Sequence, residues 1–439
     1  MGLYFGTDGF RGIVNEDLTK DIAFKIGNAL SSLVKNPKVL IGADTRISNT
    51  FITLAVASGV LSGGGDVLDL GVIPTAGVAY LTKKLGYDYG VVISASHNSG
   101  EYNGIKVFNK NGYKLGEKEE EMIERCFIHE KINSYPNVGK YVQDFSAIKI
   151  YRDFLIKQSR NSLKGLTLVL DCAFGASHKI APEVFRKLGA KVIASHSANN
   201  GKKINENCGA LYPENLKGRI ERYKADAGFA FDGDADRLMV VDENGNVCDG
   251  DKVICALAKY YKSKNMLKGN TAVGTSHTNM GIENELKENG IELLRTDIGD
   301  KYVLAKLLEK DLTVGGEQSG HVILNGVATT GDGILTAIEV ANMMIERKLK
   351  ASELLQVKLY PQTNINIVVN DKFKIMNSEK LSKVITEYNI ELMGKGRIMV
   401  RASGTEPKVR VMVESKDKEE NDRIALDIKN TIITIDKEI

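Results

Sequence analysis

The sequence predicts an α/β protein with three similar α/β domains that have mixed sheets, plus a C-terminal α+β domain, arranged around a central cleft. Three observations support this: the chain has 439 residues, a strand–helix–strand pattern occurs three times, and the last stretch has a different pattern. One hydrophobic core rarely serves a chain longer than about 300 residues. We therefore expect several domains.

Each repeat consists of a short apolar strand, a polar loop, an amphipathic helix, a glycine and a second strand. Strands that alternate with helices of this length predict mixed or parallel sheets covered on both faces. Three such units suggest internal duplication. The predicted strand, helix and strand are 38–42, 51–61 and 66–70 in the first repeat, 166–170, 181–188 and 190–193 in the second, and 271–274, 281–289 and 291–294 in the third.

The C-terminal stretch combines strands near 363–369, 397–401 and 409–414 with a helix near 378–388 and a charged final helix. This pattern favours an α+β module. Only seven prolines occur, so no proline-rich linker marks the joints, and we place boundaries where the pattern restarts. The predicted domains are 1–152, 153–251, 252–365 and 366–439.

Composition excludes several classes of protein. The apolar fraction of 43% and the charged fraction of 26% are typical of folded globular chains, and a net charge of +3 without a Lys/Arg block argues against a nucleic-acid partner. Five cysteines without a C-x-x-C pair indicate neither a disulfide framework nor a zinc site. The start lacks a signal-peptide pattern and no apolar run is long enough to span a bilayer, so we expect a cytoplasmic protein with no membrane partner.

The segment 91–98 ends a strand with Ser94, Ser96 and His97, and Lys106 follows shortly after. A hydroxyl beside an imidazole and near a lysine has the elements of a nucleophile with proton handling and charge neutralisation. Both serines fall on the same strand face, so spacing does not choose between them. A strand end capped by small polar residues is the alternative explanation.

Asp232, Asp234 and Asp236 directly follow an apolar strand. Three carboxylates packed together need a cation, and hard oxygen ligands suit Mg²⁺ or Ca²⁺. An EF-hand loop would place Glu243 at its last ligand position, but Arg237 stands where that loop needs glycine. Because three carboxylates leave Mg²⁺ partly uncoordinated, we expect a phosphate partner for the metal. An acidic turn without an ion is the alternative.

Two further loops carry polar groups suited to a sugar phosphate. Alternate residues share one side of an extended segment, so a carboxylate, a hydroxyl and an imidazole can converge on a polyhydroxylated ligand. These are Glu317, Ser319 and His321. The second loop resembles a phosphate cradle without the Walker pattern of a nucleotide P-loop. Its members are Arg401, Ser403, Gly404, Thr405 and Arg410. Ordinary turns are the alternative for both loops.

In this order, the four motifs resemble the alpha-D-phosphohexomutase superfamily, and the resemblance covers the whole chain. The opening segment 5–12 is similar to the first motif of that family, whose phosphate-binding arginine maps to Arg11. Within the superfamily, Gln318 and its neighbours resemble the phosphoglucosamine mutase subgroup, as do three further segments, 204–209, 299–303 and 328–333. Two residues depart from the family pattern. Ser99 replaces a usual proline, which could loosen the serine loop, and Ala235 replaces a usual glycine.

The resemblance implies a phosphohexomutase that interconverts glucosamine 6-phosphate and glucosamine 1-phosphate and so supplies UDP-N-acetylglucosamine and cell-wall precursors. It implies a phosphorylated Ser96, glucosamine 1,6-bisphosphate as intermediate and activator, and one Mg²⁺ ion per chain held by the three aspartates and a phosphoryl oxygen. His97, Arg11 and Arg237 would assist catalysis. Lys106 and His321 would be acid and base.

The same resemblance implies that Glu317 and Ser319 hold sugar hydroxyls, and that the C-terminal loop holds the phosphate that is not reacting. The partner would be a small-molecule sugar phosphate. A homodimer is one option for the oligomeric state, and the C-terminal domain is expected to hinge. A phosphoglucomutase or phosphomannomutase is the alternative enzyme. A phosphosugar- or Ca²⁺-binding protein without turnover is the alternative outside enzymes.

Overall fold

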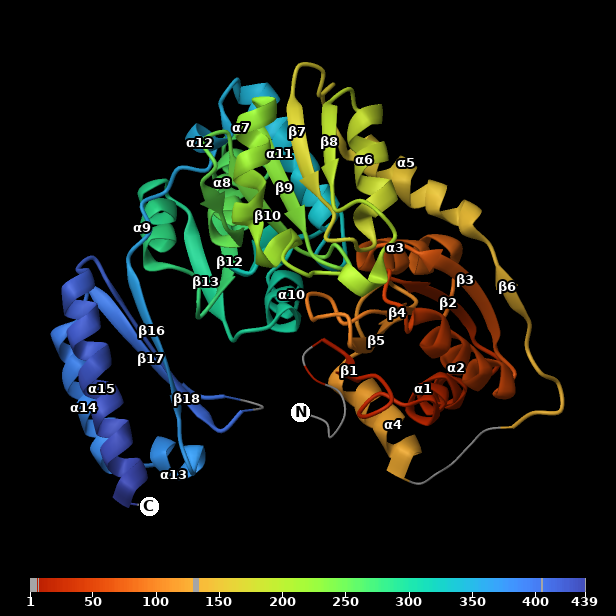
Figure 1. The fold of residues 1–439 in the computed structure, drawn as a ribbon, viewed down its shortest axis with the longest axis horizontal. Helices are drawn as coiled ribbons and strands as arrows, with labels where there is room; N and C mark the ends of the chain where they lie inside the picture. The colour runs from red at the N-terminus through yellow and green to blue at the C-terminus, as the bar shows by residue number, and fades with distance from the viewer. Residues whose placement is uncertain (1–5, 7, 129–133, 404–405, 439) are drawn as a thin grey trace. The chain divides into compact units, whose positions relative to one another are not determined.

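The computed structural model describes residue 6 and residues 8–128, 134–403 and 406–438. The chain forms two compact units. The first comprises 1–278 and 289–356, and the second comprises 279–288 and 357–439. Three sheets belong to the first unit and a fourth sheet to the second (Figure 1).

The first unit alternates strands and helices along the chain. Its strands are β1 (Phe10–Ile13), β2 (Lys38–Ala43), β3 (Asp66–Val72), β4 (Tyr89–Ile93), β5 (Tyr102–Asn109), β6 (Tyr141–Gln143), β7 (Thr167–Asp171), β8 (Lys191–Ser195), β9 (Ala227–Phe231), β10 (Leu238–Asp242), β11 (Val247–Cys248), β12 (Thr271–Thr275), β13 (Glu292–Thr296), β14 (Val314–Gly316) and β15 (Val322–Leu324). Its helices are α1 (Lys20–Leu33), α2 (Asn49–Ser62), α3 (Thr75–Leu85), α4 (Glu117–Ile128), α5 (Ile148–Gln158), α6 (Ser177–Lys187), α7 (Lys217–Tyr223), α8 (Gly250–Ser263), α10 (Asp300–Glu309), α11 (Gly333–Arg347) and α12 (Ala351–Leu354).

The three sheets of the first unit contain one common arrangement of four strands. Two parallel strands, joined through a helix, lie side by side, a third parallel strand lies on the other side of the first, and a fourth runs antiparallel to the third. The equivalent sets are β2, β3, β4 and β5; β7, β8, β9 and β10; and β12, β13, β14 and β15. The prediction of three similar domains with mixed sheets is therefore confirmed.

Burial explains why the parallel strands are apolar along their whole length. Strands β4 and β9 are buried at every position, since elements cover both faces of a parallel sheet. Helix α1 packs on α2, while α3 packs on α5.

Helix α6 begins at Ser177, a turn before the predicted start at residue 181, so Pro182 lies inside the helix. Among the described helices, none combines the length and apolar character that a bilayer crossing requires.

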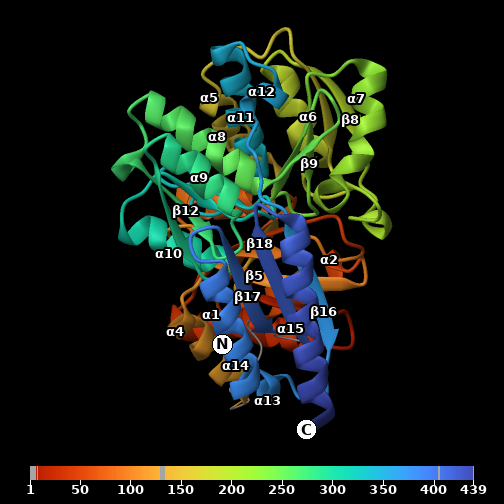
Figure 2. The ribbon, with the colours of Figure 1, turned by 90° about the vertical axis from the view of Figure 1, so that its left-hand side faces the viewer.

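The second unit has a separate core and a three-stranded antiparallel sheet in the order β16 (Gln362–Val368), β18 (Lys408–Ser415) and β17 (Gly396–Ala402). Its helices are α9 (Met280–Glu288), α13 (Lys372–Met376), α14 (Glu379–Glu391) and α15 (Lys418–Glu438). Ile424, Ile428, Ile432 and Ile435 place one apolar stripe of α15 in this core. Figure 2 shows α15 running along the sheet. The α+β prediction for this part is confirmed, whereas the domain boundaries stay predictions.

Candidate active site

Three of the four motifs occupy equivalent loops, each connecting the third strand of a repeat to its antiparallel fourth strand. They are the connections from β4 to β5, from β9 to β10 and from β14 to β15. The loops also contact one another. The Ser96 hydroxyl donates to Asp232 Oδ2 at 2.6 Å. The backbones of Arg237 and His321 form an isolated antiparallel β-bridge. The duplicated topology therefore brings three loops together. They are the serine loop with Ser96, the acidic loop with Asp232, Asp234 and Asp236, and the sugar loop with Glu317, Ser319 and His321.

The hydrogen bonds distinguish the two candidate serines. The Ser94 hydroxyl donates to Asp44 Oδ2 at 2.5 Å and accepts from the backbone N–H of Ser96 at 2.9 Å. The Ser96 hydroxyl instead faces the acidic loop and lies 3.4 Å from His97 Nδ1. Ser94 therefore supports the loop, while Ser96 offers its oxygen to the acidic loop.

Arg46 holds the Ser96 loop, and sequence reasoning missed this residue. The side chain is fully buried and donates from Nε to Asp44 at 2.9 Å. Its terminal nitrogens donate to four backbone carbonyls of the loop, those of Ser96 (3.0 Å), Asn98 (2.6 Å), Tyr102 (2.8 Å) and Ser99. The sequence does contain a signal that could have identified Arg46, because two opposite charges, Asp44 and Arg46, directly follow an apolar strand. A buried ion pair is costly unless its remaining hydrogen bonds are satisfied, and here the loop satisfies them.

The loop conformation bears on the two departures from the family pattern. Ser96 and Ala235 have φ of 50° and 59°, in the left-handed region that favours glycine. The usual glycine at position 235 thus has a conformational reason, and alanine there carries some strain. At position 99, the Ser99 hydroxyl donates to Glu101 at 2.7 Å and the Ser99 carbonyl accepts from Arg46.

Asn205 contacts the same loop from the second repeat. Its side-chain amide donates to the carbonyls of Ser96 and Asn98, each at 2.9 Å, and its backbone N–H donates to Ala173 O at 3.1 Å. The Ala173 N–H in turn donates to Asp171 at 2.9 Å. Asn205 belongs to the segment 204–209 singled out for its resemblance, but no role was predicted for it.

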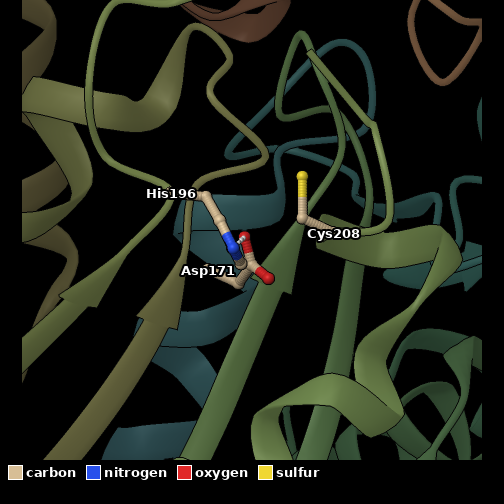
Figure 3. Close-up of side chains that lie close together, drawn as sticks. All are labelled: Asp171, His196 and Cys208. Carbon is tan, nitrogen blue, oxygen red and sulfur yellow. Dashed lines mark ion pairs between the residues drawn. The ribbon is translucent and has the colours of Figure 1, made fainter. Parts of the chain in front are cut away.

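Asp171, which is linked to Asn205 through Ala173, forms a cluster with His196 and Cys208 (Figure 3). One ligand atom from each lies within 4.8 Å of the others, so the cluster has the spacing of a metal site. The Asp171 carboxylate, however, already accepts from Gly209 N–H at 3.0 Å as well as from Ala173 and lies 3.0 Å from His196 Nδ1. Burial raises the pKa of Cys208 to about 12, so the sulfur is a neutral thiol. The cluster therefore positions backbone for the Asn205 loop.

The three aspartates of the acidic loop are buried and lie within 4.8 Å of one another. Lys106 Nζ donates to Asp234 at 2.8 Å and to Asp236 at 3.2 Å, and Thr75 Oγ1 donates to Asp234 at 2.6 Å. Burial and the two neighbouring carboxylates raise the pKa of Asp232 well above its ordinary value. The three carboxylates outnumber the lysine and the arginine beside them, Lys106 and Arg237.

The acidic loop fits a divalent metal. Among the described residues, Asp234 Oδ1 and Asp236 Oδ1 have no hydrogen-bond partner although both are buried. A buried oxygen without a partner is costly, and carboxylate oxygens are the ligands that Mg²⁺ prefers. The segment that follows Arg237 is strand β10, so the EF-hand alternative lacks its second helix.

A pocket of about 730 Å³ in the first unit lies in front of these loops. Of the predicted site residues, seven line it: Arg11, His97, Asp236, Arg237, Glu317, Ser319 and His321. Ser96, Lys106, Asp232 and Asp234 are almost completely buried beside it. The structure therefore gathers the predicted residues of the first three motifs into one site.

Charge differs sharply among the proton-handling candidates. Burial, together with Arg237 and Arg11, lowers the pKa of His97 to about 4, so its ring is neutral. Burial alone would lower the pKa of Lys106, but Asp234, Asp236 and Asp8 hold it well above its ordinary value. The Lys106 ammonium is therefore charged and paired with carboxylates in this state.

His321 has neighbours that favour both protonation states of its ring. Although burial opposes the charged ring, Asp236 and Asp300 raise the pKa of His321. The Gly331 N–H donates to Nε2 at 3.0 Å, which requires the neutral ring. These opposing contacts suit a group that gains and loses a proton.

The arginine motif lies in the second unit. Arg401 of β17 stands directly opposite Arg410 of β18, and burial and Arg410 lower the pKa of Arg401. Like charges directly opposite across a sheet are unfavourable, so this pair is suited to an anion. Ser403 is buried, and its carbonyl accepts from Lys372 Nζ at 2.6 Å. Gly404 and Thr405 lie outside the described residues.

Family models match nearly the whole chain. They describe the phosphoglucomutase/phosphomannomutase α/β/α domains I, II and III at residues 2–133, 140–245 and 249–360, and the C-terminal domain at 365–431. The chain belongs to the phosphoglucomutase/phosphomannomutase family. The resemblance to phosphohexomutases seen in the motifs is thereby confirmed.

Individual relatives agree with this membership. The phosphoglucosamine mutase of Caldanaerobacter subterraneus subsp. tengcongensis is 44% identical over 98% of this chain and 99% of its own length. A phosphoglucomutase/phosphomannomutase family protein of Burkholderia thailandensis has the same fold, with a TM-score of 0.83, 24% identity and coverage of 97% and 96% of the two chains. So does the N-acetylphosphoglucosamine mutase of Aspergillus fumigatus, solved with GlcNAc-6P and magnesium, with a TM-score of 0.67, 18% identity and coverage of 98% and 95%.

Proposed function

We propose that this family member is a phosphoglucosamine mutase that interconverts glucosamine 6-phosphate and glucosamine 1-phosphate. The observation that carries the proposal is the 2.6 Å hydrogen bond from the Ser96 hydroxyl to the acidic loop, within a chain whose full-length relatives bear this name. A nucleophilic oxygen beside a metal site is the arrangement that phosphoryl transfer through a phosphoserine requires.

Mg²⁺ would be held by Asp232, Asp234, Asp236 and a phosphoryl oxygen on Ser96. When bound, the ion would offset the negative charge of the transferring phosphoryl group. The chain's own cations would add to this neutralisation, since Arg11, Arg237 and Lys106 lie at or beside the pocket. Phosphoryl transfer depends mainly on such positioning and charge compensation.

In the first step, the bond between phosphorus and Ser96 Oγ would break, and a bond would form to the C1 hydroxyl oxygen of glucosamine 6-phosphate. His321 would accept the hydroxyl proton and Lys106 would donate one to Ser96 Oγ. The product is glucosamine 1,6-bisphosphate. After this intermediate turns round, its C6 phosphate would return to Ser96 and glucosamine 1-phosphate would leave, with the two proton transfers reversed.

Substrate contacts would be shared between loops. Glu317 and Ser319 line the pocket and would accept and donate hydrogen bonds to sugar hydroxyls. Arg401, Ser403, Gly404, Thr405 and Arg410 would bind the phosphate that is not reacting. One Mg²⁺ ion per chain, a homodimer, a hinge at the C-terminal domain and a cytoplasmic location stay predictions.

The test compares Ser96→Ala with Ser94→Ala. After incubation with glucosamine 1,6-bisphosphate and Mg²⁺, intact-mass measurement should find one phosphate on the wild type and on Ser94→Ala, and none on Ser96→Ala. Turnover of glucosamine 6-phosphate should be lost in Ser96→Ala alone. Wild-type turnover by Ser96→Ala would contradict the mechanism, and a clear preference for glucose or mannose 6-phosphate would contradict the substrate.

A further inference from the structure

The sugar loop is joined to a turn that the mechanism above does not use. The side-chain amide of Gln318 donates to Asp249 Oδ2 at 3.2 Å, and the backbone N–H of Gly250 donates to Gln318 O at 3.0 Å. Gly250 permits this close approach, since a Cβ there would lie 2.1 Å from the Glu317 carbonyl oxygen. The turn and the loop therefore form one continuous part of the pocket wall.

Asp249 brings a carboxylate into the pocket described above. It lines the same cavity as Glu317 and Ser319 and is half-buried. Its other oxygen accepts from Lys252 N–H at 3.2 Å and so caps helix α8. One oxygen is thus committed to the helix, while the other faces Gln318.

Each of the other pocket aspartates forms an ion pair with a lysine of the protein. Asp8 and Asp236 pair with Lys106, and Asp300 pairs with Lys114. Within the described part of the chain, Asp249 has no ion-pair partner, and Gln318 donates a hydrogen bond without cancelling its charge. A partly buried carboxylate that accepts a hydrogen bond from an amide still carries its negative charge, so a cation beside it would stabilise it.

We propose that Asp249 selects an amino sugar by binding the ammonium group at C2 of the substrate, with Gln318 as the positioning residue that orients its carboxylate. This inference rests on the proposed function and adds the group that distinguishes glucosamine from glucose. Glucosamine carries an ammonium at C2 in neutral solution, where glucose carries a hydroxyl. A hydrogen bond between two charged groups is roughly twice as strong as a neutral one, so the carboxylate favours the amino sugar.

The competing explanation is that Asp249 only caps α8. Asparagine caps helices about as well as aspartate, so Asp249→Asn keeps the cap and removes the charge. Asp144→Asn is the matched control, because Asp144 is exposed and caps the helical turn 145–147 with a 2.7 Å bond from Ser146 N–H. Gln318→Met removes the orienting amide and keeps an unbranched side chain of similar length.

The experiment measures kcat and KM for glucosamine 6-phosphate and glucose 6-phosphate with Mg²⁺ and the matching bisphosphate. We expect Asp249→Asn to lower the ratio of the two kcat/KM values about 10- to 100-fold, the range for loss of a hydrogen bond to a charged group, and mainly through KM for glucosamine 6-phosphate. Gln318→Met should lower the ratio in the same direction by less. Asp144→Asn should keep the wild-type ratio.

Three results would overturn the inference. If Asp249→Asn reduces kcat/KM equally for both substrates, Asp249 has a structural role only. If the wild type prefers glucosamine 6-phosphate and both Asp249→Asn and Gln318→Met keep that preference, selection lies elsewhere while the proposed function stands. If the wild type prefers glucose 6-phosphate, the proposed function fails and this inference fails with it.

Discussion

At the scale of single residues, the arrangement around Ser96 depends on a buried guanidinium. Arg46 joins Asp44 to four backbone carbonyls between Ser96 and Tyr102, and Asn205 also donates to two of those carbonyls. Ser96 itself is held at φ 50°, which a non-glycine residue adopts only where its surroundings impose it. Arg46 is therefore a positioning residue for Ser96.

Replacing Arg46 tests this role. Arg46→Met leaves the Asp44 carboxylate buried without its partner, so the free energy of unfolding should fall by about 3 to 5 kcal/mol. The rate of Ser96 phosphorylation by glucosamine 1,6-bisphosphate, followed by intact mass, should fall as well. Urea unfolding measures the stability. The control is Arg219→Met, at an exposed arginine of α7. An Arg46→Met protein no less stable than this control would contradict the assignment.

At the scale of elements, the packing of α8 against the sugar loop is close enough to exclude any side chain at its first residue. The Cβ of an alanine at position 250 would meet the backbone of Glu317 and Gly320. Backbone atoms cannot move aside like the end of a long side chain. A substitution at Gly250 should therefore displace the loop that carries Glu317 and Ser319.

Gly250→Ala and Gly218→Ala make a matched pair of substitutions in helices. Overpacking at Gly250 should cost about 1 to 3 kcal/mol of stability, and KM for glucosamine 6-phosphate should rise because the sugar loop shifts. Gly218 lies in α7 with open space around it, so Gly218→Ala should add about 0.5 to 1 kcal/mol and leave KM unchanged. Denaturant unfolding and steady-state kinetics check both. Equal KM values in the two variants would show that the loop does not move.

At the scale of the whole molecule, function depends on duplication. Three repeats with the same strand order place three loops at equivalent positions, and each loop supplies a different chemical group: a hydroxyl, three carboxylates, or a carboxylate with an imidazole. The same carboxylates that would hold Mg²⁺ repel one another without a cation. Metal binding should therefore stabilise the folded chain.

Magnesium should raise the melting temperature of the protein. At a free concentration about 100 times Kd, a ligand that binds only the native state adds about 2.7 kcal/mol. Hydrogen exchange should slow most in the segments 94–103 and 232–237. Asp234→Asn should lose both effects while keeping the volume of the side chain. A melting shift of equal size in Asp234→Asn would place the bound metal elsewhere.

Much of the fold was predictable because helices and strands are set by local periodicity. The three strand–helix–strand units, the mixed sheets and the different C-terminal module all followed from apolar spacing within windows of a few residues. The acidic loop was predictable for a similar reason, since three carboxylates within five residues are a local pattern that favours a bound cation. The predicted start of α6 at residue 181 was wrong by one turn, since the helix begins at Ser177.

What the sequence determined by itself was therefore the class of fold, the order of the four motifs and the chemistry available in each. Only the tertiary structure decided which serine faces the acidic loop, that Arg46 and Asn205 hold it, and that Gln318 contacts Asp249. These contacts join residues 50, 109 and 69 positions apart. No local pattern encodes such pairs, because they exist only once separate elements have packed against one another.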